Sequence, residues 1–300
     1  MRHNIRPKAI NAGRSAGSNC CLCKVNKATK ENSHIVPKFM TKSILGSGSQ
    51  KRAFLINSGK TYKAPSISQD TAKEDFILCE SCERYFSVLE TYLSTRLHNR
   101  IHHVKFANQF TTLENDGGIT YKICNEIDSR IFRLFLYSII WRCSVSSEEA
   151  YIDFSLESDE EETLQKALLS SKCESQADLL NSIDETAEEM ATIPFVFFTA
   201  ESFSDPTGNV VAANPFAKNP YQLILNEYML IFSFNNNNNQ MLFEFLNNTD
   251  NQPIKVGFFS TDLWVSLRQR FLRKAVENSM GHLSREGRTP WFMNNPDVQE

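Results

Sequence analysis

The segment Cys20-Cys21-Leu22-Cys23 is matched further along the chain by Cys79-Glu80-Ser81-Cys82, with 55 residues between the two CxxC pairs. Each pair can present two thiolates from one tight turn, and two pairs complete the tetrahedral shell of sulfur ligands that Zn²⁺ prefers. The spacing predicts one structural zinc ion bound by Cys20, Cys23, Cys79 and Cys82, with Cys21 as an alternative to Cys20. A closed shell of four cysteines has no open position and cannot itself activate water.

The cysteine content also bears on the compartment. No stretch approaches the roughly 20 apolar residues that span a bilayer, and the N-terminal residues 1–6 lack the apolar core of a signal peptide. We therefore expect a cytoplasmic protein with no membrane partner. In a reducing compartment, paired cysteines favour metal binding over disulfides. Three further cysteines, Cys124, Cys143 and Cys173, are expected to be buried thiols.

Charge is distributed unevenly along the 300 residues. Residues 1–110 contain 18 Lys/Arg against 7 Asp/Glu, whereas residues 111–300 contain 14 against 28. A basic segment of this kind is typical of a module that binds a polyanion. The acidic remainder of the chain is expected to have another role. The expected partner is nucleic acid, with DNA as the first choice.

Hydrophobic periodicity divides the chain further. Residues 1–19 predict a flexible basic arm, and residues 20–80 predict hairpins and loops. A long helix is expected from Ser81, with an apolar stripe reaching Val104 and with Glu83 and Glu90 two turns apart on one side. The turn at residues 115–118 is a candidate boundary.

The rest of the sequence predicts helices followed by strands. A very apolar helix is expected at 127–144, and acidic helices are expected from 157 and at 175–190. Strands are predicted at 194–199, 221–234, 241–246 and 254–259, with Asn235–Asn239 as a loop between antiparallel strands, and an amphipathic helix is predicted at 261–279. The expected fold is α+β: a zinc-stapled module at 20–110, then an acidic α+β domain at 120–300.

His34 is the only histidine between the two CxxC pairs, in the segment Asn32-Ser33-His34-Ile35-Val36-Pro37. A CxxC pair, then a His-apolar-apolar-Pro segment, then a CxxC pair that opens a helix resembles the HNH, or His-Me finger, nuclease family. The resemblance implies a ββα-type module in which His34 is the general base. It also implies a catalytic Mg²⁺ or Mn²⁺ near Glu83, with Ser33 as a further possible ligand.

A closer resemblance is to a group of poorly characterised bacterial proteins with the same zinc module. It covers residues 20–92 and about 130–146, and it includes the segments Ser33–Phe39, Gln69-Asp70 and Leu78–Glu83. Asp70 and Glu90 are possible catalytic helpers. His98 and His102 form an i, i+4 pair that could bind metal or could be a solvated helix face, and Asn57 is a weak candidate for the residue that orients His34.

The sequence leaves three candidate functions open. The first is a metal-dependent nuclease, a hydrolase of bacterial defence against phage or of a mobile element. In it His34 deprotonates water and a basic group binds the phosphate backbone, namely Lys38, Lys42, Lys51 and Arg52. Ser33 and Glu83 stand where the family usually has an acid and a histidine or asparagine, which favours the second: a non-catalytic zinc-binding module for nucleic acid or protein. The third is a scaffold in which residues 120–300 bind a regulatory partner or a second copy.

Overall fold

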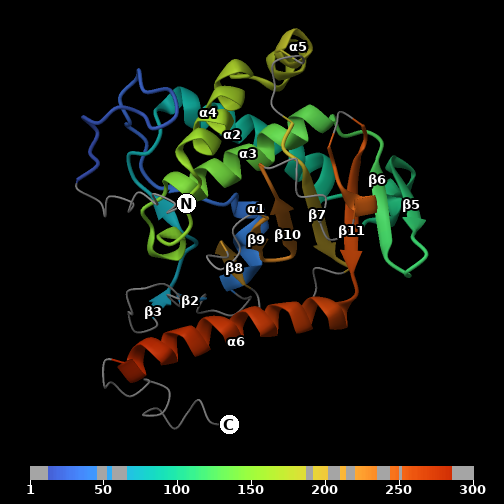
Figure 1. Ribbon diagram of the computed structural model, residues 1–300. Coiled ribbons are helices and arrows are strands. Elements are labelled where there is room, and N and C mark those ends of the chain that lie inside the picture. The colour runs from blue at the N-terminus through green and yellow to red at the C-terminus, as the bar shows by residue number, and fades with distance from the viewer. Residues whose placement is uncertain are drawn as a thin grey trace.

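A computed structural model describes the fold over part of the chain. The described residues are 13–45, 53–55, 66–186, 192–201, 210–213, 220–234, 244–249 and 252–285. The structure mixes helices and strands, as the sequence predicts (Figure 1). In this part of the chain no helix is long and apolar enough to cross a membrane.

A seven-stranded sheet with the order β5-β6-β11-β7-β10-β9-β8 forms the centre of the structure. Neighbouring strands are antiparallel except β11 and β7, which are parallel. The last strand that the structure describes therefore lies between β6 and β7. The strands are β5 (Phe110–Glu114), β6 (Thr120–Cys124), β7 (Phe195–Ala200), β8 (Val211–Ala213), β9 (Tyr221–Leu225), β10 (Tyr228–Phe232) and β11 (Ile254–Phe259).

Helices lie on both sides of this sheet. Figure 1 shows α2 (Glu80–Leu93), α3 (Ser129–Val145) and α4 (Ser158–Ser170) grouped together, with α6 (Thr261–Arg285) on the opposite side of the strands. Most of α3 is buried on all sides, as its continuous hydrophobicity predicts. On the opposite face, Trp264 of α6 stacks on Phe259. A further helix, α5 (Gln176–Thr186), follows α4.

The N-terminal segment forms two short ribbons. Strand β1 (Ser33–His34) pairs antiparallel with β4 (Lys73–Glu74), and β2 (Ala53–Leu55) pairs antiparallel with β3 (Ser66–Ser68). Between them lies α1 (Lys38–Thr41), which continues into a 3-10 helix at Lys42–Leu45. Helix α2 follows β4, and it begins at the second CxxC pair.

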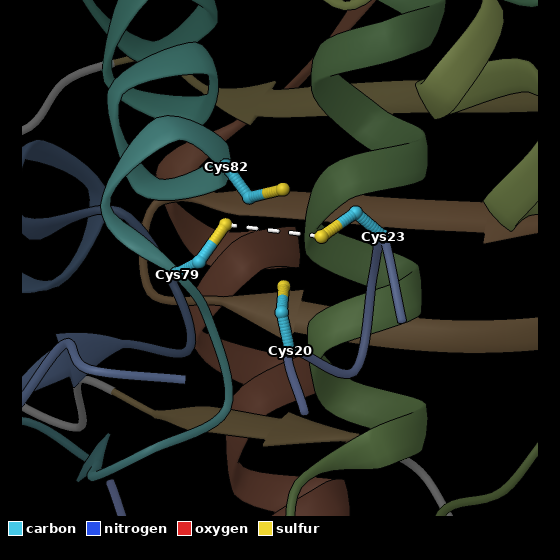
Figure 2. A group of neighbouring side chains, drawn as sticks. All are labelled: Cys20, Cys23, Cys79 and Cys82. Carbon is cyan, nitrogen blue, oxygen red and sulfur yellow. Dashed lines mark hydrogen bonds between the residues drawn. The ribbon is translucent and has the colours of Figure 1, made fainter. Parts of the chain in front are cut away.

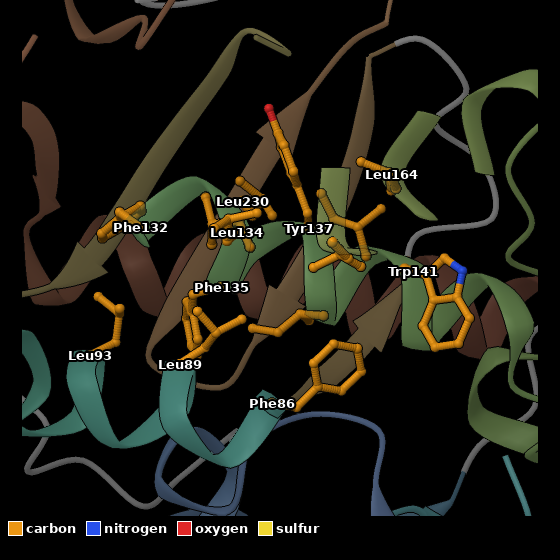
Figure 3. Close-up of a cluster of buried hydrophobic side chains, with 14 of the residues drawn as sticks. Phe86, Leu89, Leu93, Phe132, Leu134, Phe135, Tyr137, Trp141, Leu164 and Leu230 are labelled. Atoms are coloured by element: carbon orange, nitrogen blue, oxygen red, sulfur yellow. The ribbon is translucent and has the colours of Figure 1, made fainter. Parts of the chain in front are cut away.

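One hydrophobic core joins the N-terminal segment to the large sheet. Phe86, Leu89 and Leu93 of α2 point toward Phe135 and its neighbours on α3 (Figure 3). The same core includes Leu230 of β10, and it also includes Cys20 and Ile35 from the zinc-binding segment. The buried interior is therefore continuous across the predicted boundary between residues 20–110 and 120–300.

Several local predictions need correction. The helix predicted as far as Val104 ends as α2 at Leu93, and a short π-helix follows at Ser94–His98. Val104 is 88% exposed, so it does not belong to the apolar stripe. The end of the strand predicted at 241–246 is a 3-10 helix, Glu244–Leu246. The Asn235–Asn239 loop and residues 241–243 lie outside the described residues.

Two more features differ from the expectations. The turn at 115–118 is confirmed, but it connects β5 to β6 within the large sheet and does not separate two cores. The predicted flexible arm is described from residue 13, and its end is fixed to the fold. There Arg14 forms an ion pair with Glu74 at 2.5 Å and donates to the carbonyl of Val145 at 2.8 Å.

Candidate metal centre and the side chains around it

The four predicted zinc ligands come together. The sulfurs of Cys20, Cys23, Cys79 and Cys82 lie within 4.8 Å of one another (Figure 2). With a Zn–S distance of about 2.3 Å, sulfurs at the corners of a tetrahedron are about 3.8 Å apart. The Sγ atoms of Cys23 and Cys79 are 3.8 Å apart. The donor set and its spacing fit a zinc ion, and a closed shell of four thiolates gives such an ion a structural role.

Local backbone geometry explains why these cysteines converge. The amide of Lys24 donates to the carbonyl of Cys20 at 2.8 Å, which closes a tight turn around the first CxxC pair. Lys24 has a φ of 58°, in the left-handed region that lets the chain reverse just after Cys23. Cys79 is the N-cap of α2 and Cys82 lies in its first turn, so the second pair is positioned by the start of a helix.

The thiols of this cluster lie close enough to shift one another's pKa. A hydrogen bond from the Cys82 thiol lowers the pKa of Cys20 to about 4, which favours a thiolate at that position. Metal binding requires deprotonated cysteines, so this arrangement suits a cation. Cys21 is outside the cluster, and burial raises the pKa of its thiol. The ambiguity between Cys20 and Cys21 is resolved in favour of Cys20.

A glutamine from α4 supports the first CxxC turn. Nε2 of Gln165 donates to the carbonyl of Cys21 at 3.2 Å and also to the carbonyl of Leu22, and its Oε1 accepts from Nζ of Lys24 at 2.9 Å. Gln165 is only 8% exposed. The loop that carries the first CxxC pair is therefore fixed by a helix more than 140 residues away in the sequence.

His34 lies on β1, and its side chain is half-buried. Its Nδ1 is 3.1 Å from Oγ1 of Thr71, in the loop before β4. Burial and the charge of Lys73 lower the pKa of His34 below 6.5, with Asp70 acting in the opposite direction. At neutral pH the imidazole is therefore uncharged, which a general base requires.

Ser33 and Glu83 are brought together by β1 and α2. Oγ of Ser33 donates to Oε2 of Glu83 at 2.9 Å, and Ser33 is 2% exposed. Successive side chains of a strand leave on opposite sides. The contacts follow this rule, since Ser33 contacts Glu83 on α2 whereas His34 contacts Thr71 in the loop before β4.

Glu90 follows Glu83 by two turns of α2, and its main partner is Arg142 of α3. Nη1 of Arg142 lies 2.8 Å from Oε1 of Glu90 and donates to the carbonyl of His34 at 2.8 Å. Burial raises the pKa of Glu90, Arg142 opposes the shift, and the charge of Glu83 adds to it. The two glutamates are thus close enough to interact, as their spacing predicts.

The predicted backbone-binding group is described only in part. Lys38 is exposed on α1. Lys51, Arg52 and the candidate Asn57 lie outside the described residues, as does the side chain of Lys42. Asp70 is largely exposed and forms an ion pair with Lys73 at 2.5 Å, which lowers the pKa of its carboxyl group.

The His98 and His102 pair is not placed in a metal cluster. Nδ1 of His98 is 2.6 Å from the hydroxyl of the buried Tyr228, and burial lowers the pKa of both histidines, that of His102 to about 4. In the described part of the chain, the four cysteines are the one group of three or more His, Cys, Asp or Glu side chains whose ligand atoms could share an ion.

Sequence reasoning missed three residues that shape this region. Arg142 could have been found, because an arginine in the interior of a very apolar helix requires a buried partner. Thr71 and Gln165 gave no signal, since a single threonine or glutamine on a polar surface is ordinary. No family model, no curated protein sequence and no solved structure matches this chain.

Proposed function

We propose that the protein is a nuclease that hydrolyses phosphodiester bonds, with His34 as the general base. The observation that carries the proposal is the placement of His34, whose Nδ1 lies 3.1 Å from Oγ1 of Thr71; burial also lowers the pKa of this imidazole. In this proposal Nδ1–H donates to Thr71, so that Nε2 keeps the lone pair that takes a proton from water. Thr71 is then a positioning residue.

The surroundings of His34 support this role. The ribbon of β1 and β4, followed by α2, is the order of elements that the resemblance to HNH nucleases implies. Lys38 and Lys73 are cationic neighbours of the imidazole, and they suit a phosphate backbone, which binds without regard to sequence. In this proposal the zinc ion fixes the ribbon against α2 and takes no part in the chemistry.

In this proposal a second, catalytic metal would bind at Glu83. Mg²⁺ commonly binds through one or two carboxylates, with water and phosphate oxygens completing its shell. Glu83 offers one carboxylate and Ser33 a hydroxyl, and these two groups are hydrogen-bonded to each other. A Mg²⁺ or Mn²⁺ ion bound there would stabilise negative charge on a phosphate, and it would lie on the side of β1 opposite to the one that carries the His34 side chain.

One observation favours a second candidate, a non-catalytic zinc-binding module that contacts nucleic acid. Ser33 engages Glu83 and Arg142 engages Glu90, so both glutamates already have partners within the chain. Such contacts hold β1, α2 and α3 together without any metal at Glu83.

The two candidates are separated by a cleavage assay. Zinc-loaded protein is incubated with plasmid DNA and with RNA, in Mg²⁺, in Mn²⁺ and without either ion. Cleavage that is lost in His34→Ala and reduced in Thr71→Val supports the nuclease. Equal cleavage by wild type and His34→Ala overturns it. Binding without cleavage, by both proteins and under all three conditions, supports the non-catalytic module instead.

A further inference from the structure

Strand β5 is an open edge of the large sheet. It stands first in the strand order and pairs with β6 on one side, and Figure 1 shows it at the right-hand end of the strands. Its residues Thr111–Glu114 are all exposed. Native proteins usually block such an edge with proline, lysine or a bulge, because its free backbone groups can pair with another strand. The segment Phe110–Glu114 contains neither residue, and its pairing with β6 is unbroken.

The hydrogen bonds at the ends of the β5–β6 hairpin show which backbone groups of β5 face outward. The amide of Asn115 donates to the carbonyl of Ile119 at 3.1 Å, and the amide of Asn125 donates to the carbonyl of Gln109 at 3.2 Å. In an antiparallel pair, hydrogen-bonded positions alternate with positions whose N–H and C=O point away from the partner strand. The odd-numbered residues of β5 therefore bond to β6, and the even-numbered residues direct their backbone groups outward.

Two of the outward-facing residues offer both backbone groups to another strand. The amide of Phe110 already donates to the carbonyl of Ala107, at the end of the preceding 3-10 helix. Thr112 and Glu114 are exposed, and each has one N–H donor and one C=O acceptor on the outer side. These four groups are arranged evenly on the two sides of Leu113.

We infer that β5 pairs antiparallel with β5 of a second copy of this chain, about a two-fold axis that passes beside Leu113. Thr112 of each copy then lies opposite Glu114 of the other, and the two residues exchange N–H···O=C bonds in both directions. This register uses all four outward groups of each copy. A register centred on Thr112 would place Glu114 opposite Phe110, whose amide is already engaged.

The side chains favour the same register. Leu113 is 39% exposed, and its neighbour across β6 is Tyr121. At the two-fold axis Leu113 lies directly opposite Leu113 of the second copy. This pair of positions is not hydrogen-bonded, so its side chains approach closely. The contact removes one exposed leucine of each copy from water, which favours association.

Charge favours a second copy over an unrelated strand. Lys105 is exposed just before β5, whereas Glu114 and Asp116 are exposed at the far end of the strand. Antiparallel pairing brings the acidic end of each β5 to the basic start of the other. Glu114 lies opposite a threonine, so no like charges face each other within the strand pair. The edge is thus complementary to itself in backbone, apolar contact and charge.

The test is sedimentation velocity of the zinc-loaded full chain over a wide range of concentration. We expect a monomer at low concentration and a dimer at high concentration, since an interface built on one edge strand is small. Leu113→Lys should abolish the dimer, because two lysines would then face each other at the axis. Thr111→Lys is the matched control: it adds the same charge on the same face of β5, away from the axis, and should keep the dimer.

A mixture of two variants tests the self-pairing of Leu113 directly. Leu113→Glu alone should be monomeric for the same reason as Leu113→Lys. An equal mixture of the two should regain the dimer, because a lysine then faces a glutamate across the axis. Thr112→Pro tests the backbone: it removes an outward N–H that the fold of one copy does not use, and it should weaken the dimer by at least about 10-fold.

Three results would overturn the inference. A wild type that stays monomeric at every concentration leaves the edge to an extended segment of another protein. A dimer that persists in Leu113→Lys, or a mixture that fails to regain it, shows that the two copies do not pair at Leu113. Sedimentation requires neither substrate nor a second metal, so its outcome is independent of the His34 cleavage assay.

Discussion

The hydroxyl of Ser33 lies 2.9 Å from Oε2 of Glu83, at the two positions where the HNH resemblance expects metal ligands. Ser33→Asp would place two carboxylates side by side, and like charges this close destabilise the fold until a cation joins them. We expect a lower Tm than wild type without divalent ions and a rise in Tm when Mg²⁺ or Mn²⁺ is added. Ser33→Asn, which adds no charge, is the control. If the Tm of Ser33→Asp does not change when either ion is added, the result argues against a metal at Glu83.

The four-cysteine centre predicts one zinc ion per chain. Structural zinc contributes about 10–16 kcal/mol in zinc-finger peptides, which is as large as the stability of a whole domain. Cys79→Ser should therefore fail to retain zinc and fail to fold. Cys173→Ser, which changes a buried thiol outside the cluster, should retain the metal. Elemental analysis and circular dichroism report both outcomes, and a folded wild type without metal would refute the site.

Gln165 supplies two hydrogen bonds to the backbone of the first CxxC turn. Residues that orient metal ligands typically contribute about 10- to 100-fold to metal affinity. We expect Gln165→Ala to weaken zinc binding by about that factor, measured by competition with a chromogenic chelator. Lys166→Ala changes the exposed neighbour on α4 and should leave the affinity unchanged. Equal affinities for the two variants would show that the turn holds its shape without α4.

Arg142 neutralises Glu90 inside the protein, and removing one partner of a buried pair leaves an uncompensated charge. Arg142→Met should lower the free energy of unfolding by about 3 kcal/mol, at the low end of the usual range because the Glu90 side chain is still 24% exposed. The double variant Arg142→Met/Glu90→Gln should recover part of the loss. Urea unfolding gives both values, and additive losses in the double variant would mean that the pair does not interact.

The stability should also depend on pH through His102. This residue takes up a proton near pH 6.5 in an unfolded chain but only near 4 in the folded protein, because burial and the charge of Lys122 lower its pKa. Between these values the unfolded chain binds more protons, so stability falls as the pH drops from about 6.5 to 4. His102→Gln should flatten this slope in urea unfolding. His103→Gln, at an exposed position, should keep it.

Local sequence patterns predicted helices and strands. The contacts between segments that are distant in the sequence were harder to predict. The apolar run of α3 and the strands β7, β9, β10 and β11 follow from composition and periodicity. The parallel pairing of β11 with β7 could not be predicted, because no local signal specifies which distant strand is a neighbour. The short strand β8 has too few residues for an alternating pattern.

In the candidate site, too, local patterns predicted some features, whereas contacts between distant segments were not predicted. Cysteine spacing identified all four residues of the cluster that could bind a metal, since two tight turns fix their geometry in advance. The spacing of Glu83 and Glu90 placed them on one side of α2. The side-chain partners of these residues, such as Thr71 for His34, depend on loop conformation, which the sequence does not encode in a periodic way.

The position of β11 has a consequence for how the chain reaches its native state in the cell. This strand is the last that the structure describes, yet it joins β6 on one side to β7 on the other. While the protein is being synthesised, the β5–β6 hairpin has no neighbour to pair with until residue 259 has left the ribosome. All strands between residues 110 and 259 must therefore emerge before the sheet closes, and until then the newborn polypeptide exposes unpaired strand edges, which favour aggregation.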